Sequence, residues 1–150
     1  MGTFSFDETV KILLEQPAEF RKLCSLNPRV LELRGLHNET LLHFLAVEGE
    51  ATAVALLGEL GANVNATNNY GDTALHDCVA FGNVDLCTLL LSLGANPNHQ
   101  NAQGYTALHT AFENNTGDHI FQMLLKAGGN MSLKNNYGQT PGDSFLNRDG

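Results

Sequence analysis

The sequence lacks the features that would place the chain in a membrane or in the secretory pathway. Its 150 residues contain no run of about 18 or more apolar residues, so no transmembrane helix is predicted. Residues 1–8 lack the basic start and long apolar stretch of a secretory signal. Cysteine is scarce: Cys24, Cys78 and Cys87 make an odd count without a C-x-x-C pair. We therefore expect free thiols in the core, a reducing compartment and a cytoplasmic location.

Basic side chains are missing from most of the chain. Lys and Arg total 8 against 16 Asp and Glu, which gives a net charge of −8. None of the basic residues lies between Gly35 and Leu125, although that stretch carries nine acids. A surface without cations cannot neutralise phosphates, so binding of nucleic acid or of an anionic membrane is not expected. A protein partner with a basic patch would be attracted, although the same acidity would also keep a protein dispersed in solution.

A tetrapeptide returns at a fixed spacing along the chain. Thr40-Leu-Leu-His43, Thr73-Ala-Leu-His76 and Thr106-Ala-Leu-His109 follow one another at intervals of 33 residues. Two further series keep nearly the same spacing: Gly61-Ala-Asn63, Gly94-Ala-Asn96 and Gly128-Gly-Asn130, and the turns Tyr70-Gly-Asp72, Gln103-Gly-Tyr105 and Tyr137-Gly-Gln139. The last step is 34 residues, and its extra residue falls in the polar segment Glu113–Asp118. A fixed period of this length indicates a repeat architecture.

Each unit is predicted to form a helix, a turn, a second helix and an extended loop. In the middle unit Thr73 can cap the first helix, Gly82 ends it, and the second helix stops at Gly94. Apolar residues recur on one side of both helices at helical spacing. Because neither helix can bury its apolar stripe alone, the units must stack on one another.

Over residues 36–141 these patterns resemble the ankyrin-repeat family. The family's T-P-L-H tetrapeptide, central glycine and G-A-D-V-N ending correspond to Thr40–His43, Gly49 and Gly61–Asn65. The resemblance implies an all-α solenoid, here one domain over residues 1–150. Its predicted parts are an N-terminal helix-pair cap at 6–35, three full repeats at about 36–68, 69–101 and 102–135, and a partial C-terminal cap repeat at 136–150.

The cap departs from the repeat pattern. Phe6–Glu15 and Pro17–Leu26 are predicted as its two helices, and Asn27–Arg34 follows where a repeat has its extended arm.

The resemblance also implies a binding surface for a protein partner, made by the loop tips and the exposed face of each first helix. We call this surface the concave strip. Its positions differ between the repeats while the core positions do not, so packing does not select them. Carried over position by position, it contains Leu36, His37, Glu39, Val47, Glu48, Asn69, Tyr70, Asp72, Ala80, Phe81, Ala102, Gln103, Tyr105, Glu113, Asn114, Asn136, Tyr137 and Gln139.

Large aromatic residues are the expected anchors of this strip, because aromatics dominate interface hot spots. Phe81 and Tyr105 are predicted to carry most of the binding, with Tyr105 directed outward. Tyr70 and Tyr137 are equally compatible with packing on a neighbouring repeat. The acids beside the aromatics are expected to steer a cationic partner.

The chemical alternatives find no support in the sequence. The histidines of the tetrapeptides lie in successive repeats, whose helices pack roughly 8–10 Å apart, whereas zinc ligands must each approach the metal within about 2.1 Å. The resemblance instead implies that each ring hydrogen-bonds the adjacent turn and its threonine, which makes Thr40, His43, Thr73, His76, Thr106 and His109 structural.

The cysteines and glycines do not indicate catalysis either. Cys78 and Cys87 stand where the family has small apolar residues and are predicted to be buried and unbridged. The glycines form no phosphate-binding motif. No enzyme, cofactor or metal site is predicted. The chain is expected to be a monomeric adaptor or inhibitor that binds a partner protein, the alternative being a targeting or scaffold segment of a larger protein.

Overall fold

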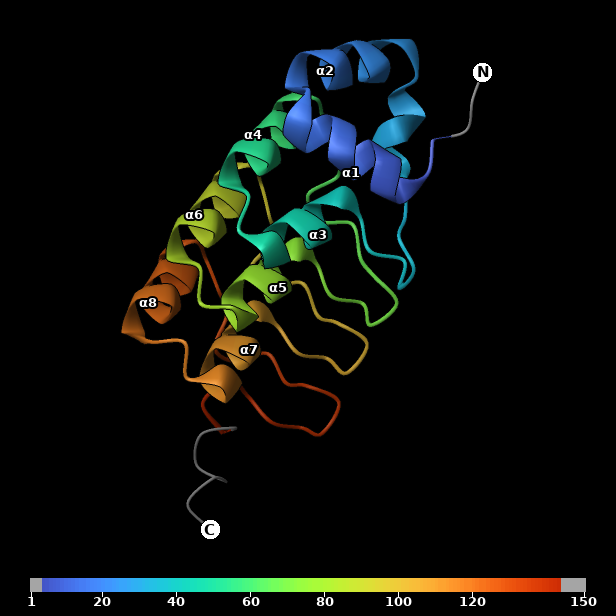
Figure 1. The fold of residues 1–150 in the computed structure, drawn as a ribbon. Helices are drawn as coiled ribbons and strands as arrows, with labels where there is room; N and C mark the ends of the chain where they lie inside the picture. The colour runs from blue at the N-terminus through green and yellow to red at the C-terminus, as the bar shows by residue number, and fades with distance from the viewer. Residues whose placement is uncertain (1–3, 144–150) are drawn as a thin grey trace.

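Residues 4–143 are described by the computed structural model, and they form eight α-helices, one 3₁₀ helix and no β-strand (Figure 1). The elements follow one another as α1 (Phe6–Glu15), α2 (Pro17–Leu26), η1 (Pro28–Glu32), α3 (Leu41–Glu48), α4 (Ala51–Glu59), α5 (Ala74–Ala80), α6 (Val84–Ser92), α7 (Ala107–Asn114) and α8 (Asp118–Lys126).

The helices are stacked in pairs. The first helices α3, α5 and α7 lie side by side in one layer, and the second helices α4, α6 and α8 form the other layer (Figure 1). The loops that join one pair to the next project together from the side of the first helices. This arrangement confirms the predicted all-α solenoid.

The core runs continuously between the two layers. Leu45, Leu57, Leu75, Leu90 and Leu108 come from five different helices, and all of them are fully buried. Burial of such a side chain stabilises the fold by about 1.5–3 kcal/mol. Because each first helix contacts those before and after it, the apolar stripe of one repeat is covered by its neighbours.

The projecting loops have a repeated turn built on asparagine. In the turn before α7, the side-chain oxygen of Asn101 accepts hydrogen bonds from the amides of Gln103 (3.0 Å) and Tyr105 (2.9 Å). Gly104 has φ +80°, and a Cβ there would lie 2.7 Å from the amide nitrogen of Asn136 in the next loop. Only glycine fits this position, since it tolerates both the positive φ and the close approach. Asn68 and Asn135 make the same bonds in the other two turns.

Adjacent loop tips are joined by backbone hydrogen bonds. The bonds are Asn69 N to His37 O (3.1 Å), Ala102 N to Tyr70 O (3.0 Å) and Asn136 N to Gln103 O (2.9 Å). Each acceptor precedes the residue of its turn that has a positive φ, which is Asn38, Gly71 or Gly104. These bonds fix the register of the loops, which carry most residues of the concave strip.

The N-terminal pair has the two helices predicted from the sequence, with the same bounds. Ser5 caps α1, and Glu8 completes a capping box with it. The segment after α2 differs from the predicted extended arm, because Pro28–Glu32 form the 3₁₀ helix η1. Pro28 has the fixed φ of a helical first position, and Val30 is buried in the core, so the segment turns instead of extending.

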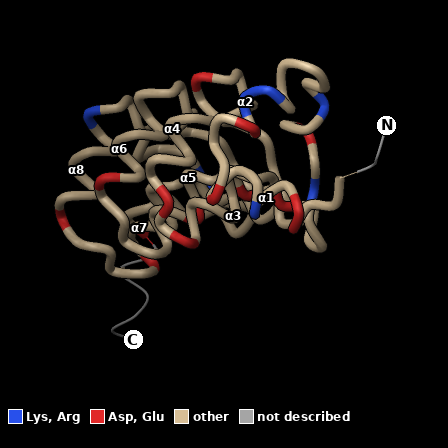
Figure 2. Tube along the Cα trace, turned by 45° about the horizontal axis from the view of Figure 1, so that its top comes forward, with Lys and Arg blue, Asp and Glu red and all other residues tan. Residues whose placement is uncertain are grey.

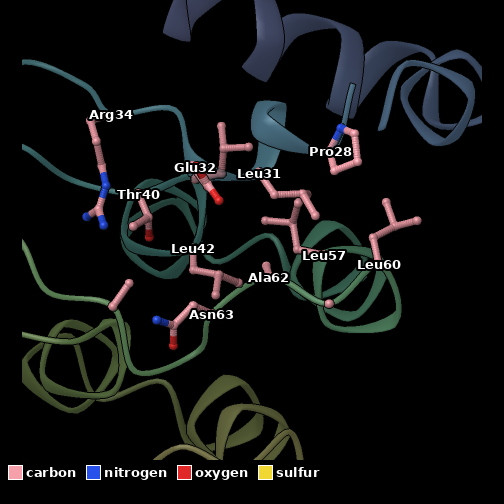
Figure 3. Close-up of a pocket in the computed structure, with 13 residues that line it drawn as sticks. Pro28, Leu31, Glu32, Arg34, Thr40, Leu42, Leu57, Leu60, Ala62 and Asn63 are labelled. Atoms are coloured by element: carbon pink, nitrogen blue, oxygen red, sulfur yellow. The ribbon is translucent and has the colours of Figure 1, made fainter. Parts of the chain in front are cut away.

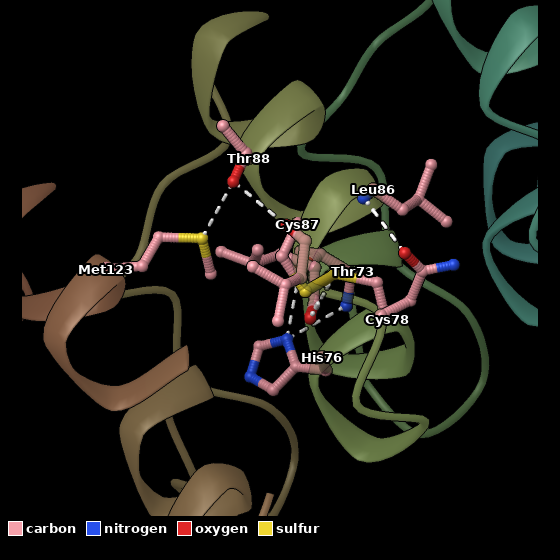
Figure 4. The surroundings of a disulfide bond; sticks show 10 residues. Thr73, His76, Cys78, Leu86, Cys87, Thr88 and Met123 are labelled. Carbon is pink, nitrogen blue, oxygen red and sulfur yellow. Dashed lines mark hydrogen bonds between the residues drawn. A yellow bond between two sulfur atoms is a disulfide. The ribbon is translucent and has the colours of Figure 1, made fainter. Parts of the chain in front are cut away.

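A disulfide joins Cys78 of α5 to Cys87 of α6 (Figure 4). Both side chains are fully buried, as predicted, but the prediction that they are unbridged is wrong. The antiparallel packing of α5 on α6 brings the two Cα atoms to 5.7 Å, within the range that a disulfide spans. Cys24 remains a buried free thiol, and burial raises its pKa. Cysteine usage therefore no longer favours a reducing compartment.

The C-terminal stub is described as far as Asp143. Its turn repeats the asparagine geometry at Asn135, and Thr140 donates to the Asp143 carboxylate from both its amide (2.9 Å) and its hydroxyl (2.7 Å). These two bonds lower the pKa of Asp143. The predicted continuation of the stub over residues 144–150 lies outside the described residues.

Candidate functional site

The three Thr–His pairs hold the loop before each first helix against the next loop. In each pair the threonine hydroxyl lies within hydrogen-bond distance of the histidine Nδ1, at 2.7 Å for Thr40–His43, 3.0 Å for Thr73–His76 and 2.9 Å for Thr106–His109. The Nε2 atoms donate to the carbonyl oxygens of Asp72 (2.8 Å), Tyr105 (3.1 Å) and Gln139 (3.1 Å). The predicted bonds from each ring to its threonine and to the adjacent turn are confirmed.

The bonding pattern fixes the protonation of these rings. Each Nδ1 accepts a bond from the backbone amide of its threonine, at 3.1–3.2 Å, so the proton is on Nε2, where a carbonyl accepts it. Burial lowers the pKa of His43 and His76 and keeps both rings neutral. Residues 4–143 contain no group of three or more His, Cys, Asp and Glu side chains placed to hold a metal ion. The three pairs are thus saturated structural bonds between repeats.

Most predicted residues of the concave strip are exposed. The side chains open to solvent are those of Leu36, His37, Val47, Glu48, Asn69, Tyr70, Ala80, Phe81, Ala102, Gln103, Asn114, Asn136 and Tyr137. Partly buried are Glu113 and the four residues that stand directly before each threonine, namely Glu39, Asp72, Tyr105 and Gln139. The carbonyl oxygens of three of them, Asp72, Tyr105 and Gln139, accept hydrogen bonds from the buried histidines, so these residues lie close to the core.

The tyrosine predicted to point outward is the least exposed of the three, and the two whose exposure was left open are exposed. Tyr105 is partly buried: its ring packs edge-on against His109, with centroids 5.4 Å apart, and lies 6.5 Å from that of Tyr137. Tyr70 and Tyr137 are 62% and 66% exposed. The prediction that Tyr105 points outward is therefore wrong. The residue after the turn glycine lies against the next helix, whereas the residue before the glycine lies at the tip.

A small hollow of about 140 Å³ lies on the strip between α5 and α7. We call it the α5–α7 hollow. Its lining includes predicted residues from two turns and two helices, together with Asp77, Asn101 and Thr110, which were absent from the predicted set; the full lining is Asp72, His76, Asp77, Ala80, Asn101, Gln103, Tyr105, Thr110 and Glu113.

Asp77 is the unusual member of this lining. Burial, followed by the nearby charge of Asp72, raises the pKa of Asp77 from 3.8 to about 7. The positions 33 residues before and after it hold Phe44 and Thr110, so the fold does not require a carboxylate there. The sequence held a usable signal: an acid at a position of the first helix that is uncharged in the other two repeats.

Two other acids of the hollow have partners. The Asp72 carboxylate accepts a hydrogen bond from the side-chain amide of Asn101, at 2.8 Å. The Tyr105 hydroxyl is hydrogen-bonded to the side chain of Glu113; after burial, this bond is the main cause that raises the pKa of Tyr105. The arrangement holds negative charge in a fixed geometry and provides no nucleophile–base pair.

Comparison with protein families gives two matches along the chain. A model described as ankyrin repeats in three copies matches residues 3–101, and a single ankyrin-repeat model matches residues 103–136. The first match alone covers more than half of the chain and includes the N-terminal helix pair. The chain belongs to the ankyrin-repeat family. Among curated proteins, none matches its sequence.

Ankyrin repeats are generally protein–protein interaction modules, and proteins built from them are typically not enzymes. None of the helices in residues 4–143 is both long and apolar enough to span a bilayer.

Charge is unevenly distributed over the ankyrin repeats. Figure 2 shows Lys and Arg mostly around the N-terminal pair α1 and α2, and acids spaced along the following repeats. Within residues 4–143 the one ion pair joins Arg21 of α2 to Glu59 of α4, at 2.6 Å between two exposed side chains. The stretch from Gly35 to Leu125, which carries most of the concave strip, thus contains no Lys or Arg.

A larger hollow, of about 650 Å³, lies between η1 and the first repeat (Figure 3). Its lining is mixed: Leu31, Leu57 and Leu60 lie on its apolar side, and Glu32, Thr40 and Asn63 are among its polar lining residues. The guanidinium of Arg34 at its edge already donates to the carbonyls of Asn38 (3.0 Å) and Thr67 (2.8 Å). Thr40, another polar residue of the lining, is bonded to His43, so these two polar groups already have partners within the protein.

Proposed function

We propose that the chain binds a partner protein through the concave strip, as an adaptor or an inhibitor. The observation that carries this proposal is the distribution of exposed apolar side chains. From residue 36 to residue 143, six large hydrophobic side chains are exposed, and only Val84 belongs to a second helix. The other five all belong to the strip: Leu36, Val47, Tyr70, Phe81 and Tyr137. Exposed apolar groups gathered on one face favour an interaction site there.

The rigidity of the strip also supports this proposal. Its loop tips are joined by backbone hydrogen bonds, and its turns are fixed by the asparagine side chains and the Thr–His pairs. A surface that is already ordered loses little conformational entropy when a partner binds. The strip therefore needs fewer favourable contacts for a given affinity than a flexible loop would.

The acids favour a partner with a basic patch. Glu48 is exposed on α3, and Asp72, Asp77 and Glu113 surround the α5–α7 hollow. No Lys or Arg lies between Gly35 and Leu125 to oppose an approaching cation. Charges of one sign speed the association of an oppositely charged protein and make the rate depend on salt.

The test is to isolate the partner by affinity capture and then to compare binding kinetics of two matched variants. Phe81→Ala removes a 65% exposed aromatic side chain from the strip, and Val84→Ala removes a 40% exposed apolar side chain from the second helix of the same repeat. We expect Phe81→Ala to weaken binding by about 2 kcal/mol, since central aromatic contacts dominate interfaces. Val84→Ala should bind like the unmodified protein.

The opposite pattern would contradict the proposal: binding unchanged by Phe81→Ala but lost with Val84→Ala would place the interface on the second helices. A charge variant supplies an independent readout. Glu48→Gln should slow association about two- to fivefold at low salt and leave dissociation nearly unchanged, because a rim charge acts mainly on the encounter.

A further inference from the structure

The α5–α7 hollow contains one acid, Asp77, to which no other described residue donates a hydrogen bond. Asp72 is bonded to Asn101, and Glu113 is bonded to Tyr105. Within residues 4–143, no side chain donates a hydrogen bond to the Asp77 carboxylate, and no cation pairs with it. A partly buried carboxylate in this state is costly to ionise, since it has lost water without gaining a partner.

The fold gains nothing from an acid at this position. Phe44 and Thr110 occupy the equivalent sites of the other two repeats, and both repeats pack around the same Thr–His pairs. Both of these residues are uncharged. A side chain that raises the free energy of the folded state, at a site where neutral residues are structurally acceptable, indicates a function other than packing.

Among the described residues of the repeats, none supplies a cation for Asp77, and the acids around it form no metal-binding group. The repeats contain no Lys or Arg before Lys126 at the end of α8. The three acids of the hollow are not placed as a metal-binding group among the described residues. The remaining class of counterion is an organic cation, namely an ammonium or guanidinium group.

We infer that the α5–α7 hollow receives a lysine or arginine side chain of the partner protein, with the Asp77 carboxylate as its counterion. This inference rests on the proposed function and names the group that the strip recognises. The hollow, of about 140 Å³, exceeds the ~30 Å³ share of one water molecule several-fold, and so accommodates a cationic head group with its last methylenes. Asp72 and Glu113 supply further negative charge at its wall.

The surroundings define the rest of the recognised segment. Ala80 lines the hollow, and the next residue, Phe81, is 65% exposed at the end of α5. Tyr70 is exposed on the neighbouring loop tip. A partner segment that inserts its cation into the hollow therefore places adjacent residues on aromatic surface, so the preferred segment has an apolar or aromatic residue beside its Lys or Arg.

A library of random dodecapeptides displayed on phage tests this inference without knowledge of the natural partner. The library is selected on the unmodified protein, and the enriched peptides are synthesised and measured against two acid-to-amide variants. Asp77→Asn removes the counterion, whereas Asp85→Asn makes the same chemical change on an exposed site of α6 in the same repeat. We expect enriched peptides that share a Lys or Arg and bind Asp77→Asn about tenfold or more weakly, with affinity for Asp85→Asn unchanged.

A selection that yields no such peptides overturns the inference, as do enriched peptides whose affinity is the same for both variants. Phe81→Ala separates this failure from a failure of the proposed function. Peptides whose binding is weakened by Phe81→Ala but unchanged by Asp77→Asn would support binding at the concave strip and contradict a cation in the hollow. Peptides whose binding is unchanged by both variants but weakened by Val84→Ala would contradict the concave strip as the binding surface as well.

Discussion

Two positions of each repeat, the Thr–His pair and the helix position that holds Asp77 in the middle repeat, differ in how far they are repeated and in their hydrogen bonding. The pairs are identical in all three repeats, nearly completely buried and fully hydrogen-bonded. The other position holds Phe44, Asp77 and Thr110, and Asp77 has no hydrogen-bond donor among residues 4–143. Residues that join the repeats are thus repeated with them, whereas residues that serve one face of the solenoid vary. The saturated polar atoms of the pairs hold the repeats together, and the acid without a donor is the one that we propose for recognition.

The largest expected effect comes from removing a member of a saturated pair. His76→Ala leaves the Tyr105 carbonyl and the Thr73 amide without their partner and opens a cavity under the turn. We expect the free energy of unfolding to fall by about 3 kcal/mol or more, since buried groups lose both hydrogen bonds and packing. Urea denaturation measures this, with His119→Ala on the exposed side of α8 as the control. A loss below about 1 kcal/mol would show that the pair does not hold the repeats together.

The disulfide should contribute almost as much to the free energy of unfolding as His76 does. Cys78 and Cys87 close a loop of nine residue steps, for which chain entropy predicts a contribution of about 2–3 kcal/mol to the free energy of unfolding. Adding a reductant should therefore destabilise the unmodified protein and leave the Cys78→Ala/Cys87→Ala double variant unaffected. A count of free thiols under denaturing, non-reducing conditions should give one, from Cys24. Three free thiols would contradict the disulfide.

Replacing Asp77 by a neutral residue should stabilise the protein, whereas His76→Ala and reduction of the disulfide should destabilise it. The pKa of Asp77 is about 7 in the folded protein against 3.8 for a free side chain, so the folded state holds its proton longer than the unfolded chain. Stability due to this group is complete below pH 3.8 and is lost as the pH rises toward 7. The other titratable groups lining the hollow are Asp72, His76, Tyr105 and Glu113.

Asp77→Asn removes this loss. At pH 8 we expect the variant to be more stable than the unmodified protein by about 2 kcal/mol, a value discounted for the partial exposure of the side chain, and equal to it near pH 3.5. Urea denaturation across this pH range, with Asp85→Asn as the matched control, measures the difference. Equal stabilities at pH 8 would mean that Asp77 is ordinarily solvated.

The sequence predicted the features that repeat. The bounds of α1 and α2 and the stacking of the helix pairs follow from periodic patterns. The bonds of the Thr–His pairs and the positions of the strip were implied by the resemblance to ankyrin repeats, and most of those positions are exposed.

What the sequence did not predict depends on packing between particular side chains. The odd cysteine count gave no sign that Cys78 faces Cys87 across two antiparallel helices. The sequence also did not show that the ring of Tyr105 packs edge-on against His109, while its carbonyl bonds to His76. Asp77 was overlooked because the charge of a residue on a helix reveals nothing about how much water reaches it.

The most direct test of this division between structure and recognition is the pKa of the Asp77 carboxyl itself. Carbon-13 NMR of the side-chain carboxyl, followed from pH 3 to pH 9 in the free protein, should give a titration midpoint of about 7. Addition of an enriched peptide that carries Lys or Arg should lower that midpoint, because a nearby cation favours the ionised carboxylate. A midpoint near 3.8 in the free protein, unchanged by the peptide, would contradict the account.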